Sequence, residues 1–161
     1  MYKLVLFLLS AAFAMMLHAS QLDQEMAVRT LFWAKRALNR AVHAAAQELD
    51  PAALSRGVPM LDEEAAERTA RAYLQANLRL DGDLSPLGDS FLQSRVEVLA
   101  WEVIQGTESF PYTYRNEPLG FAVTLRRPGV IMAIRVEYPR LFRLLGPIRW
   151  DLKGAAELVE P

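Results

Sequence analysis

The chain has 161 residues, a mass of 18.1 kDa and a net charge of −1, which allows one ordinary domain and excludes the strongly basic surface of a dedicated nucleic-acid binder. It has no Cys, so disulfide scaffolds, thiolate metal sites and Cys nucleophiles are excluded. Its two histidines, His18 and His43, lie far apart and supply little for metal or Ser-His-Asp chemistry. We therefore expect no enzyme, no cofactor or metal, and no nucleic-acid partner.

The chain begins with an apolar run that contains no charge from Leu4 to Leu17 and follows Lys3. Extended to Leu22 the run has 19 residues, close to the roughly 20 helical residues that cross a bilayer core. This favours a retained membrane anchor. Its expected lipid-facing residues are Leu4, Val5, Leu6, Phe7, Leu8, Leu9, Phe13, Met15, Met16 and Leu17.

A cleaved signal peptide is the alternative, with the cut after Ala19 and the mature chain beginning at Ser20. Signal peptidase prefers a small residue three positions before the cut, and Leu17 occupies that position. No Pro or Gly occurs before Pro51, so nothing ends a helix near residue 20. Helix continuity favours the anchor.

From Asp23 to Gln47 the sequence has the period of an amphipathic helix. Its expected packing stripe consists of Ala27, Leu31, Ala34, Leu38, Ala41 and Ala45. Two interpretations remain open: the stripe packs on the rest of the chain, or part of the helix packs against other subunits. Phe32 and Trp33 lie off the stripe and are candidate contact residues for the second interpretation.

Residues 49–60 predict a connector, and Asp62 is the expected N-cap of a second helix. The acidic residues that follow Asp62 favour the helix dipole, and a metal or catalytic pair is the alternative. Residues 81–89 contain Asp, Gly and Pro and predict turns, with a calcium loop as the alternative.

The remaining sequence predicts strands at 95–105, 120–126 and 130–138, the last two joined as a hairpin, with a loop at 107–118. That loop carries Phe110, Tyr112 and Tyr114 as a candidate contact surface. The final segment, 148–159, is a strand with a break at Gly154, or a strand followed by a short helix. The expected fold is α+β: a long N-terminal membrane-anchored helix, a second short helix and a small, mainly antiparallel sheet of about four strands. The expected parts are an anchor at 1–22, an amphipathic continuation of the same helix at 23–48 and a head at 49–161.

Two stretches resemble a known family. Ala34–Asp50 (AKRALNRAVHAAAQELD) is a basic helix that runs into an Ala-rich end, and Val136–Val159 (VEYPRLFRLLGPIRWDLKGAAELV) joins two strands through Pro139 and Gly146. In these stretches and in its layout the chain resembles the TadE/TadG-like proteins of Tad (tight-adherence, Flp-type) pilus systems in Gram-positive bacteria. The resemblance implies a pilin-like fold, a membrane-anchored subunit and other pilin-like subunits, or copies of the chain, as partners.

The expected function is that of a structural or accessory subunit of a surface filament, and the alternative is a stand-alone anchored or secreted binding module. The expected location is the cell membrane with an extracytoplasmic head, or a cell-surface filament. The charges disagree with this orientation. Only Lys3 precedes the apolar run, whereas Arg29, Lys35 and Arg36 follow it, and the positive-inside rule would leave the head in the cytoplasm.

Overall fold

The computed structural model describes residues 2–140 and 146–159, and it has the expected α+β architecture. A single helix of 44 residues begins the chain, and the strands form two separate antiparallel sheets. In chain order the elements are α1 (Tyr2–Ala45), α2 (Pro51–Leu54), α3 (Glu63–Leu78), β1 (Glu97–Ile104), β2 (Tyr112–Asn116), β3 (Phe121–Leu125), β4 (Gly129–Tyr138) and β5 (Ile148–Glu157). Sheets of three and two strands replace the single sheet of about four strands that the sequence predicts.

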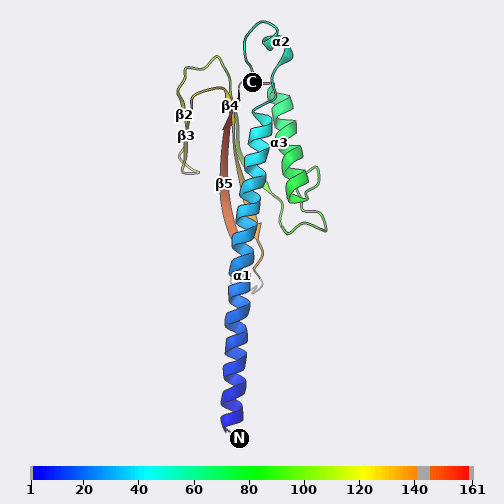
Figure 1. The fold of residues 1–161 in the computed structure, drawn as a ribbon, viewed down its shortest axis with the longest axis vertical. Helices are drawn as coiled ribbons and strands as arrows, with labels where there is room; N and C mark the ends of the chain where they lie inside the picture. The colour runs from blue at the N-terminus through cyan, green and yellow to red at the C-terminus, as the bar shows by residue number, and fades with distance from the viewer. Residues whose placement is uncertain (1, 141–145, 160–161) are drawn as a thin grey trace.

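The head has three layers, with the three-stranded sheet in the middle (Figure 1). Its strand order is β1-β4-β5, so β4 is hydrogen-bonded on both edges. Alternate β4 side chains, including Met132 and Ile134, join the main core with α1 and α3. Ile131 points to the opposite face and packs under the β2–β3 hairpin. Because both faces are covered, β4 is apolar along most of its length rather than alternating.

The strand pairing differs from the predicted hairpin of 120–126 with 130–138. Strand β3 pairs with β2, with Tyr112 opposite Leu125, while β4 pairs with β1 and β5. The predicted loop at 107–118 therefore contains a strand. Both edges of β4 are occupied, so β3 finds its partner in the short, alternating Tyr112–Asn116 segment, whose tyrosines point inward.

The final segment is one unbroken strand, without the predicted break or helix at Gly154. Gly154 lies where β5 passes close to α1. A Cβ atom at Gly154 would lie 3.0 Å from Leu38 Cγ and 3.5 Å from Val42 Cγ1. The missing side chain thus permits the helix to pack closely on the strand. Close approach of another element is a common reason for a glycine inside a strand.

Helix α3 begins where the sequence predicts. The Asp62 side chain accepts a hydrogen bond from the Ala65 backbone N–H at 2.9 Å and caps the helix. The predicted connector contains α2 and is closed by a bridge between Leu49 and Leu61. The Gln105 side-chain amide pairs with both the N–H and the carbonyl of Leu61, so the end of β1 holds this connector in place.

Helix α1 is continuous, as the absence of Pro and Gly predicts, and its two halves have different surroundings (Figure 1). The N-terminal half projects from the head as an isolated rod. The C-terminal half lies against α3 and against the face of the sheet at β4 and β5, and it forms part of the main core. From about Asp23 onward, one side of α1 is therefore buried against the head.

Candidate functional site

The predicted anchor residues lie on the projecting half of α1, and all ten are exposed. Leu4, Phe7 and Phe13 are 64%, 68% and 62% exposed, and the exposed apolar side chains surround the helix on every side. A helix that is apolar all round and bare of protein is unstable in water, because each such side chain costs about 1.5–3 kcal/mol relative to burial. This surface requires lipid or another protein around it.

The length of this rod fits a bilayer. The 19 residues from Leu4 to Leu22 extend about 28 Å at about 1.5 Å per residue, close to the roughly 30 Å of a hydrocarbon core. Among the described helices, α1 alone is long and apolar enough to cross a membrane by length and composition, and none of its apolar window is buried. A signal sequence meets the same test, so the alternative of a cleaved N-terminus stands beside it.

A buried polar contact lies where the rod enters the head. Asp23 is 6% exposed, and the Tyr138 hydroxyl at the end of β4 donates a hydrogen bond to Asp23 Oδ1 at 3.1 Å. Burial, and then the bond to Asp23, raise the pKa of Tyr138 above its ordinary value. The centroid of the Trp150 ring lies 6.3 Å from that of the Tyr138 ring. The available sequence signal for this contact is an acidic residue, Asp23, that directly follows the apolar run.

We expect Tyr138→Phe to lower the free energy of unfolding by roughly 1–3 kcal/mol, because it removes a donor from a buried carboxylate. The raised pKa means that this stabilisation is complete below about pH 10 and is lost as the pH rises through the higher pKa of the folded state. Urea unfolding of the detergent-solubilised chain at neutral and alkaline pH measures both effects. Tyr73→Phe, at an exposed tyrosine on α3, is the control, and equal losses in the two variants would contradict the assignment.

The predicted packing stripe of α1 lies inside the molecule. Leu31 is half-buried and the other five stripe residues are buried, packed on the head of the same chain. The intramolecular interpretation therefore accounts for this face. Lys35 borders it: its ammonium donates to the carbonyl oxygen of Lys153 on β5, and burial lowers its pKa.

The face of α1 that points away from the stripe, which we call the outer face, carries the charged residues Glu25, Arg29 and Arg36 together with Phe32. Phe32 is 58% exposed, and Val28, one turn before it, is 50% exposed. The Trp33 ring stacks on Phe91 at a centroid distance of 4.6 Å but remains 54% exposed. Both candidate contact residues on this helix are therefore accessible, and Phe32 is the one that lies nearer the middle of the outer face.

Phe110, Tyr112 and Tyr114 occupy an inward position. All three are half-buried and pack against the small cluster of Ile104, Leu125 and Ile131 between the hairpin and the sheet. Their first role is to hold β2–β3 on the sheet, and they do not form one open aromatic surface.

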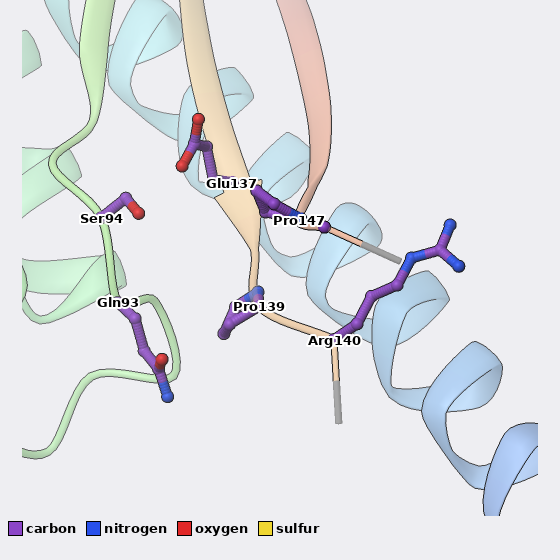
Figure 2. A pocket seen from close by; sticks show the side chains of 7 residues that line it. Gln93, Ser94, Glu137, Pro139, Arg140 and Pro147 are labelled. Atoms are coloured by element: carbon purple, nitrogen blue, oxygen red, sulfur yellow. The ribbon is translucent and has the colours of Figure 1, made fainter. Parts of the chain in front are cut away.

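A hollow of about 500 Å³ lies at the base of the head, next to the end of β4 (Figure 2). Its lining includes Ser94, Glu137 and Arg140. Arg149 donates to Glu137, and bonds from Arg149 and Ser94 lower the pKa of Glu137. The carboxylate is thus held in its charged form by a cation and is poorly suited to act as a general base near neutral pH.

Within residues 2–140 and 146–159, no cluster of three or more His, Asp or Glu side chains could hold a metal ion. The candidate calcium residues of 81–89 form turns: Asp81 accepts hydrogen bonds from the Asp83 and Ser85 backbone N–H groups. The acids at the start of α3 are also engaged, with Glu64 paired to Arg68 and Glu67 to Arg71. Comparison with protein-family models, curated proteins and solved structures finds no match to this chain.

Proposed function

We propose that this chain is a membrane-anchored, pilin-like structural or accessory subunit of a bacterial surface filament of the Tad type, with the head outside the cell. The observation that carries the proposal is the bare apolar half of α1, which projects from a folded head and matches the thickness of a bilayer core. The resemblance to TadE/TadG-like proteins supplies the filament and the outward orientation.

The contacts of α1 restrict how such a subunit would assemble. Its stripe from Ala27 to Ala45 is already covered by the head, so lateral packing falls to the outer face, where Phe32 and Val28 are exposed. Val28 and Phe32 are one helical turn apart and at least half exposed, so a neighbouring helix can cover both side chains while the charged residues of the outer face stay at its margin. The partners are then copies of this chain or related subunits.

The absence of Cys permits a direct test. Phe32→Cys places one thiol on the outer face, and Ala122→Cys on β3, also exposed, places one on the hairpin as a matched control. In membranes of expressing cells we expect mild oxidation to give a disulfide-linked dimer with Phe32→Cys and little with Ala122→Cys. A membrane-impermeant maleimide should label both thiols in intact cells if the head lies outside.

Other results distinguish the alternatives. An anchored chain that gives no dimer through Phe32→Cys contradicts lateral packing and favours a stand-alone binding module. Equal dimer yields from the two variants indicate random collision and also contradict it. Labelling only after lysis places the head in the cytoplasm, as the positive-inside count predicts.

A further inference from the structure

The base of the head lies at the level where the apolar run of α1 ends. Tyr138, at the end of β4, is bonded to Asp23, which directly follows Leu22. The polypeptide on either side of residues 141–145 is therefore held beside the first polar turn of α1. If Leu4–Leu22 lies in the hydrocarbon core, these flanking residues lie in the headgroup layer of the same membrane.

Among the described residues, Arg140 is a cation at this base with no anionic partner. It follows β4 by two residues, and its Nε is buried with no hydrogen-bond partner among the described residues. Neighbouring arginines are paired: Arg149 with Glu137, and Arg135 with Asp151. Figure 2 shows the Arg140 side chain extending away from Gln93 and Ser94 on the far side of the hollow. A half-buried guanidinium without an acceptor is costly, and an incoming anion would remove that cost.

Trp150 adds a second feature of an interfacial surface. Its indole is half-buried, packs against the core and lies beside Tyr138. Tyr and Trp are the residues that membrane proteins concentrate at the headgroup level, where one side of the ring is apolar and the other is wet. Arginine complements them, because its planar fork of donors matches a phosphate.

We infer that Arg140 binds the phosphate of a phospholipid headgroup, and that the base of the head thereby rests on the membrane surface beside its own anchor. This rests on the proposed membrane anchoring. The contact gives the head a defined height and orientation on the bilayer, whereas an anchor alone would let it tilt. The outer face of α1 is then presented in the plane of the membrane, as lateral packing between subunits needs.

The test uses the full chain in liposomes with Trp33→Phe and Trp101→Phe, which leave Trp150 as the single tryptophan. The liposomes are phosphatidylcholine with about one quarter phosphatidylglycerol, an anionic surface that strengthens contacts to basic residues. Lipids brominated near the headgroup end of their acyl chains quench a tryptophan that lies at the interface. We expect quenching of Trp150, and about a twofold or greater decrease when Arg140→Glu replaces the attraction to phosphate by repulsion.

Arg115→Glu, on the exposed side of β2, makes the same charge change away from the base and should leave the quenching unchanged. Arg140→Gln is the milder variant, in case Arg140→Glu disturbs the fold measured by circular dichroism, and it should also reduce quenching. Quenching that is unaffected by both Arg140 variants overturns the role of Arg140. Absence of quenching in a chain that floats with the liposomes overturns the resting head but leaves the anchor intact. A chain that does not float at all contradicts the anchor and, with it, this inference.

Discussion

Replacing Leu38 by alanine is expected to lower the free energy of unfolding of the head by about 2–5 kcal/mol. Leu38 is 0% exposed and belongs to the main core. It fills the space that Gly154 leaves on β5, so its removal opens a cavity between helix and sheet that the backbone of neither element can easily close. Urea unfolding of the solubilised chain, followed by tryptophan fluorescence, measures the loss.

The matched control lies on the other face of the same helix. Phe32 is 58% exposed, and Phe32→Ala is expected to change the free energy of unfolding by no more than about 0.5 kcal/mol. A similar decrease in the free energy of unfolding in both variants would contradict the assignment of Leu38 to the core and of Phe32 to the exposed surface. The comparison also shows which substitutions can test assembly: those on the stripe unfold the head, whereas those on the outer face leave it folded.

The second large effect concerns the anchor. Replacing Leu8 and Leu9 by arginine adds two charges at the middle of the apolar run, at a cost of about 2.5–3.5 kcal/mol each in a bilayer. We expect the variant to leave the carbonate-washed membrane fraction, whereas the unmodified chain stays in it with an intact mass that begins at Met1. The projecting half of α1 makes no contribution to the head core, so the head should remain folded in both.

Two arginines on the exposed face of β3, at Ala122 and Thr124, add the same charge outside the anchor and should leave the chain in the membrane. A native chain that begins at Ser20 and appears in the soluble fraction would contradict the anchor and support the signal peptide. Retention of the Leu8→Arg, Leu9→Arg variant in washed membranes would show that contacts of the head, not the apolar run, hold the chain there.

Local chemistry accounts for the features that sequence analysis predicted correctly. A 44-residue helix follows from a long segment without Pro or Gly, and the start of α3 follows from an Asp side chain that can cap a helix. The buried stripe of α1 follows from the helical period, since one face of a helix in a domain must leave water. These properties depend on residues within a few turns of each other.

The incorrect predictions concern strand pairing and helix packing, which depend on residues far apart in the sequence. The turn between 120–126 and 130–138 predicts a hairpin, but β1 and β5 occupy both edges of β4 and leave none for β3. Strand β2 has only five residues bounded by loops, and such a segment gives a weak strand signal without its partner β3 beside it. Gly154 predicts a break by its local preference, although in the fold its missing side chain makes room for Leu38 of α1.

The sequence by itself determined that this protein has a long apolar helix continuing into an amphipathic one, followed by a small α+β head. The periodicity of apolar residues and the capping of a helix are local properties, because both depend on the order of residues within a few turns. Only the tertiary structure decided that the stripe of α1 is covered by its own head, that Asp23 meets Tyr138, and that Arg140 lies at the end of the apolar run. These three features depend on contacts between residues more than 100 positions apart, such as Asp23 with Tyr138 or α1 with β5. Long-range packing, rather than local preference, brings such residues together.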